Sequence, residues 1–364
     1  MVVCGGLRRK PVLVVYGRML GIVGIFMKRG KKELSLIPIT LACPPYDRIQ
    51  ALINKSVTPE GIDLNILPME VEEVFWRQLR YAEFDVSEAS LSSYTMLRSK
   101  GDTRFIAIPA FTSRFFRHSC IFVNKNKGIN KPEDLKGKVV GVPEYQLTAP
   151  VWQRGALYDD YGVRPRDVNW RTGGIDQPGR VEKLSINLPE GVHVEPIPPE
   201  NTLSDMLHKG ELDALLTPRM PSCFINGSPN VERLFPNFRE IEEDYFRRTG
   251  IFPIMHTIVI RREIYEANRW IATSLYKAFC EAKEVVMKHY DDASALYTTI
   301  PWLFDEIERT RASLGDDFWP YGIGPNLKTL EVFFRYHHEQ GLSAKKMTIE
   351  DLFAPETLDS GFKI

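Results

Sequence analysis

Two arginines and a histidine gather in one short segment of the sequence. Arg114, Arg117 and His118 lie within five residues, just before an apolar stretch at residues 120–123 that we expect to be a strand. A guanidinium group binds a carboxylate through two parallel hydrogen bonds, and an imidazole exchanges protons near neutral pH. The segment could therefore bind an anion, or it could be a solvated basic edge. Arg48, at the start of a predicted helix, is either a third such arginine or a surface residue.

Polar residues also occur at the end of an apolar stretch, residues 86–91. Glu88 and Ser90 lie at the end of this predicted strand, where the ligand-facing residues of open α/β sheets cluster. A carboxylate between apolar neighbours is costly to bury without a partner. Glu88 could therefore accept a hydrogen bond or a proton from a ligand hydroxyl, or it could form a structural salt bridge with an arginine.

A second candidate binding loop follows another predicted strand. Residues 144–148 precede a predicted helix, for which Thr148 is a suitable N-cap. Free backbone amides at a helix N-terminus attract anions, so Tyr145 and Thr148 could help to hold a carboxylate. Trp152, on the same helix, could stack on an aromatic ring or could be a core residue.

The elements that must position these residues alternate between short strands and helices, which favours an α/β fold with a largely parallel sheet. The predicted strands fall into two sets, at residues 34–41, 62–67, 86–91, 105–109 and 120–123, and at residues 138–142, 167–171, 194–197 and 212–217. Helical spacing predicts helices at residues 148–161 and 202–209, and a long helix at about 261–289.

Composition limits the class of protein. A chain of 364 residues with 43% hydrophobic residues has enough apolar side chains for two domains. Its 47 basic and 47 acidic residues cancel, so neither nucleic acid nor a membrane surface is expected as a partner. The five cysteines are scattered and form no CxxC pair, which argues against a zinc site or a disulfide framework and favours a reducing compartment. His337 and His338 are adjacent on a predicted helix and point apart, so we expect them at the surface and predict no metal site.

The N-terminal segment differs from the rest of the chain. Residues 1–32 contain eight basic residues and no acidic one, and their apolar runs are too short to span a membrane. We predict that residues 1–33 are a disordered extension and that the protein is cytoplasmic. An organelle transit peptide is the alternative interpretation.

Two stretches resemble the type II periplasmic-binding-protein fold. Residues 128–142, GINKPEDLKGKVVGV, are similar to the segment that leads into the second lobe of that fold, and residues 202–214, TLSDMLHKGELDA, resemble its recurring helix and strand unit. The resemblance implies two lobes with a ligand cleft between them. Lobe 1 would comprise residues 34–123 and 225–364, and lobe 2 residues 124–224.

A finer resemblance covers residues 46 to about 283. The segments FDVSEAS, IPAFTSRFFRHS, GVPEYQLTA and GIFPIMH resemble the 4,5-dihydroxyphthalate decarboxylase family. The resemblance implies an enzyme, a carboxy-lyase of phthalate degradation, that converts a hydroxylated aromatic dicarboxylate such as 4,5-dihydroxyphthalate to 3,4-dihydroxybenzoate. The chain departs from the family pattern in the basic extension and in the tail beyond about residue 300.

The implied reaction needs a proton donor near the ring carbon and an acceptor near the ring hydroxyl. We expect His118 to be the acid and Glu88 the acceptor; His256, which only the resemblance singles out, is the alternative acid. Arg114 and Arg117 would hold the carboxylate that stays. No cofactor is expected, because the hydroxylated ring can itself hold the electrons of the departing group.

Two other functions fit the same fold. A solute-binding protein could deliver a small anion to an ABC-type transporter, although no cleavable export signal is evident. A pyrimidine-precursor synthase of thiamine biosynthesis would carry a cysteine-rich motif, and here the cysteines are scattered. Assembly into a homo-oligomer is compatible with the sequence.

Overall fold

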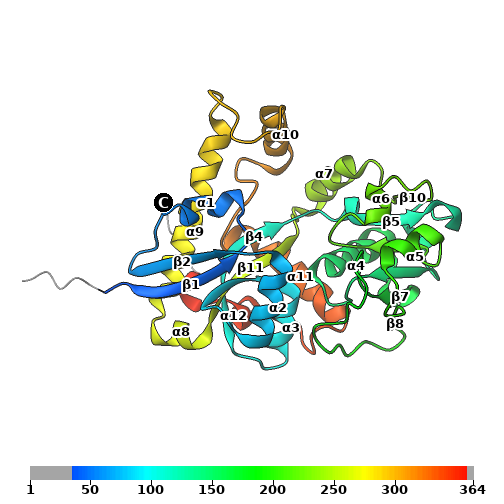
Figure 1. The fold of residues 1–364 in the computed structure, drawn as a ribbon, viewed down its shortest axis with the longest axis horizontal. Helices are drawn as coiled ribbons and strands as arrows, with labels where there is room; N and C mark the ends of the chain where they lie inside the picture. Colours follow the sequence, from blue (N-terminus) through cyan, green and yellow to red (C-terminus); the bar gives the residue numbers. More distant parts are fainter. Residues whose placement is uncertain (1–34, 359–364) are drawn as a thin grey trace, which may run out of the picture. The chain divides into compact units, whose positions relative to one another are not determined.

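Residues 35–358 are described in a computed structural model, and they contain two β-sheets (Figure 1). Both sheets belong to one unit that begins at Leu36. The predicted basic extension, residues 1–33, lies outside the described residues.

The first sheet has the strand order β2-β1-β3-β11-β4. β1 pairs in parallel with β2 and β3, whereas β11 is antiparallel to both β3 and β4. The carboxyl ends of β1, β3 and β4 and the amino end of β11 therefore lie at the same end of the sheet. The strands are β1 (Ile37–Cys43), β2 (Ile62–Pro68), β3 (Val86–Ser90), β4 (Phe105–Arg114) and β11 (Ile254–Arg261).

The second sheet has the strand order β10-β5-β9-β6-β7-β8. It extends beyond the limits predicted for the second lobe, 124–224, because β5 and β10 pair antiparallel with each other as the chain enters and leaves it. β5 begins before residue 124, and β10 lies beyond residue 224. The strands are β5 (Ile121–Asn124), β6 (Val139–Val142), β7 (Asn169–Thr172), β8 (His193–Pro196), β9 (Ala214–Leu216) and β10 (Val231–Arg233).

Helices follow most strands, as the alternating pattern predicted. The short ones are α1 (Gln50–Ile53), α5 (Leu203–Lys209), α6 (Ser222–Ile225), α8 (Arg262–Ala267) and α12 (Ile349–Leu352). The longer ones are α2 (Val71–Tyr81), α3 (Leu91–Ser99), α4 (Thr148–Tyr161), α7 (Phe238–Thr249), α9 (Trp270–Asp291), α10 (Leu303–Leu314) and α11 (Leu327–Glu339).

Local sequence explains several boundaries. Thr202 accepts a hydrogen bond from the Asp205 backbone N–H at the start of α5, and Gly210 ends that helix at a positive φ of 77°. The long helix predicted at about 261–289 is divided into α8 and α9, because Asn268 adopts non-helical angles. Asparagine side chains compete for backbone hydrogen bonds, which disfavours helix interiors.

The tail beyond residue 300 packs into the rest of the unit. Phe333 of α11 lies 5.5 Å from the ring of Trp152 in α4, and Phe353 forms a β-bridge with Ala107. His337, predicted to be exposed, is completely buried, because α11 places it against Ser92 of α3. Within residues 35–358, no helix has the length and apolar character needed to cross a membrane.

Candidate active site

A buried carboxylate lies at the edge where β3, β4 and β11 meet. Glu88 has no exposed side-chain surface and receives three hydrogen bonds. The Thr112 hydroxyl donates to its Oε1 at 2.6 Å, His256 Nδ1 lies 3.0 Å from the same oxygen, and the Tyr46 hydroxyl lies 3.3 Å from Oε2. These donors supply the partners that a carboxylate needs when it is removed from water.

The strand order explains why these side chains meet. Ile258 of β11 lies opposite Glu88 of β3, so His256, two residues earlier, points to the same face of the sheet. An ionised carboxylate can only accept, so His256 donates through Nδ1–H. Within the described residues its Nε2 has no hydrogen-bond partner, and the side chain keeps 16% of its surface exposed. His256 is therefore held at one nitrogen and available at the other.

Tyr46 and Arg48 form one side of this cluster. Arg48 Nε donates to the Thr112 carbonyl at 2.6 Å, Nη1 bonds Asp47, and the guanidinium lies 4.0 Å from the Tyr46 ring centroid. Nη2 of Arg48 has no hydrogen-bond partner within residues 35–358, so it can still donate a hydrogen bond. Burial, together with the nearby charge of Glu88, raises the pKa of Tyr46 and keeps its hydroxyl neutral.

Ser90 and Thr148 connect the two sheets. Their hydroxyl oxygens lie 2.9 Å apart, and Thr148 Oγ1 also accepts from the Ser92 backbone N–H at 3.0 Å. Thr148 was predicted to be the N-cap of α4, but it is the first helical residue. Its hydroxyl forms hydrogen bonds with the neighbouring α3 segment. A second link runs from the Ser93 hydroxyl to Gln146 at 2.8 Å.

Comparison with known proteins identifies the family. Residues 46–177 match the family described as ABC transporter, phosphonate, periplasmic substrate-binding protein. The chain is 41% identical to a 4,5-dihydroxyphthalate decarboxylase from Comamonas testosteroni over 331 residues, which cover 91% of this chain and 100% of that protein. A 4,5-dihydroxyphthalate decarboxylase from Pseudomonas putida is 42% identical over 61% of this chain and 86% of its own length. The chain belongs to the 4,5-dihydroxyphthalate decarboxylase family.

A solved structure confirms the fold class. The periplasmic aliphatic sulphonate binding protein from Escherichia coli superimposes with a TM-score of 0.50 at 13% identity, covering 89% of this chain and 99% of that protein. The chain therefore has the predicted two-lobed fold of periplasmic binding proteins.

In this member of the decarboxylase family, Arg114 and Arg117 are bound by the protein itself. Arg114 donates to the carbonyls of Phe252 and Pro320 and to the Asn326 side chain, and burial lowers its pKa to about 9. Arg117 Nη1 donates to the Pro218 carbonyl at 2.7 Å, and its Nε lies 3.3 Å from the Met255 sulfur. The sequence could not reveal these backbone acceptors, which lie 100 or more residues away.

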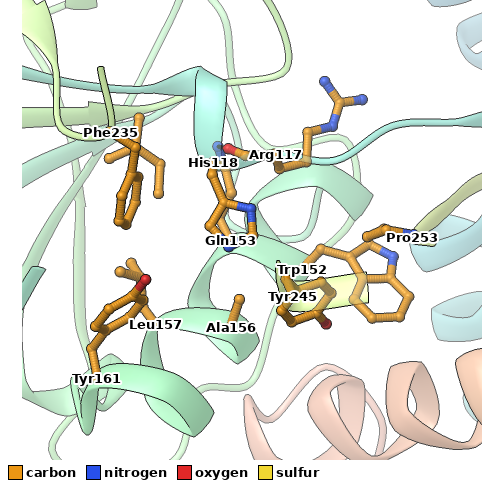
Figure 2. Close-up of a pocket in the computed structure, with 11 residues that line it drawn as sticks. Arg117, His118, Trp152, Gln153, Ala156, Leu157, Tyr161, Phe235, Tyr245 and Pro253 are labelled. Carbon is orange, nitrogen blue, oxygen red and sulfur yellow. Dashed lines mark hydrogen bonds between the residues drawn. The ribbon is translucent and has the colours of Figure 1, made fainter. Parts of the chain in front are cut away.

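His118 lies in a separate aromatic cavity (Figure 2). The ring centroids of Phe235 and Tyr245 are each 5.4 Å from its imidazole, and neither ring nitrogen has a hydrogen-bond partner within the described residues. Glu242 approaches Nδ1 only to 3.7 Å. The cavity volume is about 20 Å³, room for about one water and too small for an aromatic ring.

Two aromatic candidates are core residues. Trp152 donates its indole N–H to the Ile254 carbonyl at 2.9 Å and is 2% exposed. Tyr145 is completely buried, with the Arg154 guanidinium 3.8 Å above its ring. Neither side chain presents a free face to a ligand.

Sequence reasoning missed several polar residues of this region. Tyr46 and Thr112 complete the Glu88 cluster, and an ion-pair network joins Glu72, Glu144, Arg180 and Lys183. A signal for the network existed, since Arg180 and Lys183 follow a stretch rich in glycine and proline at residues 173–179. Within residues 35–358, no three His, Cys, Asp or Glu side chains are grouped to hold a metal ion.

Proposed function

We propose that this protein is a carboxy-lyase that converts a hydroxylated aromatic dicarboxylate, such as 4,5-dihydroxyphthalate, to 3,4-dihydroxybenzoate and CO2. The observation that carries the proposal is the hydrogen-bonded pair of Glu88 and His256. Support for the substrate class comes from the two named decarboxylases, one of which matches over its full length. The described cysteines are all free, which is compatible with action in the cytoplasm.

The chemistry of the substrate sets what the protein must supply. Direct loss of CO2 from an aromatic carboxylate would leave an electron pair that the ring π system cannot delocalise. Protonation of the ring carbon that bears the carboxylate avoids this, because the hydroxyl opposite it donates electron density. The bond to the carboxylate then breaks, its electron pair restores the aromatic ring, and CO2 leaves. One proton is consumed for each CO2 released.

We assign the proton donor to His256 rather than to His118. His256 is held at Nδ1 by Glu88 and has Nε2 free, whereas His118 lies in a cavity that holds about one water. A buried carboxylate of this kind fixes the imidazole tautomer and stabilises the imidazolium form. His256 is thus the proposed general acid.

Glu88 has a different role from the one predicted. Its two oxygens are taken by Thr112, His256 and Tyr46, so a substrate hydroxyl would have to displace one of them. We propose that Glu88 is a positioning residue for His256. Ser90 and Thr148 remain candidates to contact the substrate, and Arg48 remains a candidate through its Nη2 to bind a substrate carboxylate.

The direct test is incubation of the purified protein with 4,5-dihydroxyphthalate, with CO2 and 3,4-dihydroxybenzoate both quantified. The proposal expects equal amounts of the two products. Binding without turnover would favour the alternative, a solute-binding protein for a small anion. A panel of hydroxylated phthalates would then define which hydroxyl position the reaction requires.

A further inference from the structure

An ion-pair network connects α2 with the loop that follows β7. Glu72 Oε2 lies 3.0 Å from Arg180 Nη2 and 3.0 Å from Lys183 Nζ. The same two cations bind Glu144 Oε1, at 2.6 Å and 2.7 Å, and Glu144 is completely buried. Glu72 comes from a helix next to the first sheet, whereas the other three residues belong to the segment that forms the second sheet.

The two carboxylates of this network differ in role: Glu144 is a fixed member, and Glu72 is an exchangeable one. Glu144 needs a permanent cation, since an unpaired buried carboxylate is strongly destabilising. With two cations present, one positive charge remains, and Glu72 neutralises it. Glu72 keeps 34% of its side-chain surface exposed. Burial opposes its ionisation, but Lys183 and Arg180 outweigh that effect and hold its pKa below the usual value.

A cavity adjoins the network at Glu72. Its volume is about 330 Å³, within the range of small-molecule sites, and Glu72, Arg180, Arg219 and residues 174–179 line it. Arg219 is exposed and forms no ion pair with another residue in the described part of the chain. Asp176, the other acidic lining residue, has its Oδ1 engaged by the Ser222 backbone N–H at 2.8 Å.

The cavity and the proposed acid both contact α2, the cavity through Glu72 and the acid through Phe75. Phe75 packs its ring edge-on against His256, with ring centroids 4.9 Å apart. Glu72 and Phe75 are three residues apart on α2, and side chains at that spacing are neighbours on a helix surface. A ligand that replaced Glu72 at Arg180 would therefore approach the His256 side of α2.

We propose that Arg180, Lys183 and Arg219 bind the carboxylate that remains on the aromatic product, and that Glu72 occupies this position until the substrate displaces it. This inference rests on the proposed decarboxylase function and names its specificity residues. The exchange of Glu72 for a substrate carboxylate conserves the charge of the network. In contrast, Nη1 and Nη2 of Arg114 and Nη1 of Arg117 donate to backbone carbonyls and to the Asn326 side chain, and Arg117 Nε lies 3.3 Å from the Met255 sulfur.

Phthalate is a suitable probe, because it has both carboxylates but lacks the hydroxyl that the reaction needs. Isothermal titration with phthalate should show that Glu72→Gln binds several-fold more tightly than wild type, because an internal competitor has been removed. Glu73→Gln is the matched control on the same helix. Among the described residues Glu73 pairs only with Arg77, and the phthalate affinity of this variant should be unchanged.

The cationic side of the site is tested with Arg219→Gln, which breaks no ion pair and so should not perturb folding. We expect its phthalate affinity to fall by about tenfold, in keeping with the loss of a charge-assisted contact. Arg171→Gln is the control, and its phthalate affinity should be unchanged. Arg171 pairs with Glu195 on β8, an edge strand of the second sheet. Unchanged affinity in both Glu72→Gln and Arg219→Gln would overturn the proposal.

Parallel turnover measurements separate this proposal from the function itself. If wild type decarboxylates 4,5-dihydroxyphthalate and Arg219→Gln has an unchanged KM, the function stands and the carboxylate site is wrong. If wild type releases no CO2 but phthalate binding still depends on Glu72 and Arg219, the site stands as a carboxylate site and the decarboxylase function is wrong.

Discussion

His256 Nδ1 lies 3.0 Å from Oε1 of Glu88, although the two residues are 168 positions apart in the sequence. Antiparallel pairing of β3 with β11 brings them together on one face of the sheet. The pair leaves Nε2 of His256 as its free nitrogen within the described residues, at the edge of the sheet.

Glu88→Gln should lower kcat by about 10²–10⁴-fold, the usual contribution of general acid–base groups, because the amide no longer fixes the tautomer and orientation of His256 as the carboxylate does. Phthalate affinity should change little, since Glu88 is fully buried. Steady-state kinetics over a range of pH, with phthalate titration, provide the measurement. An unchanged pH–rate profile in the variant would refute the positioning role.

Thr112→Val should reduce the free energy of unfolding by about 1.5–3 kcal/mol, because it removes a hydrogen bond to an ionised, buried carboxylate. Thr257→Val is a matched control in the same sheet, where the hydroxyl donates to the neutral Ile108 carbonyl at 2.8 Å. Its expected cost is about 0.5–1.5 kcal/mol. Urea denaturation compares the two variants, and equal losses would argue against a charged Glu88.

His118→Phe should retain turnover and should not lose stability. Both ring nitrogens of His118 are buried without a hydrogen-bond partner in residues 35–358, and Phe235 and Tyr245 surround the ring. Replacement of an unsatisfied polar group by an apolar ring of similar shape is close to neutral or stabilising. A loss of kcat greater than about tenfold would restore His118 as a candidate acid.

Acid should destabilise the fold partly through His337. Burial lowers the pKa of this histidine to about 3, against about 6.5 in an unfolded chain. The unfolded state therefore binds the extra proton as pH falls from 6.5 towards 3, and the free energy of unfolding falls by up to about 1.4 kcal/mol per pH unit.

Urea midpoints at pH 6.5, 5.5 and 4.5 measure this slope. His337→Gln, which can still donate to the Ser92 carbonyl, should have a shallower slope than wild type. His338→Gln, at the adjacent and less buried position, should keep the wild-type slope. Equal slopes in all three proteins would show that His337 does not titrate in this window.

The sequence predicted elements better than it predicted contacts between them. The helix at 148–161 and the capped helix before Gly210 follow from local signals, and the structure contains both. Glu88 and His256 were both named as candidates, but their pairing depends on the strand order of a sheet assembled from distant segments. Local spacing cannot reveal that order.

The segment that contains Arg114, Arg117 and His118 shows how residue type alone can mislead. Its residue types suggested an anion site, yet Arg114 and Arg117 bind carbonyls contributed by segments far along the chain. A guanidinium group has five N–H donors, and backbone carbonyl oxygens can accept their hydrogen bonds as well as a ligand carboxylate can. Residue type therefore predicted the chemistry of these groups but not their partners.

The measurement that tests the account most directly is single-turnover decarboxylation of 4,5-dihydroxyphthalate by His256→Asn, with His118→Asn as the matched variant and phthalate affinity determined for both. The account predicts that His256→Asn loses about 10²–10⁴-fold in rate while it binds phthalate as wild type does, and that His118→Asn keeps its rate. A wild-type rate in His256→Asn, with collapse of the rate in His118→Asn, would contradict it.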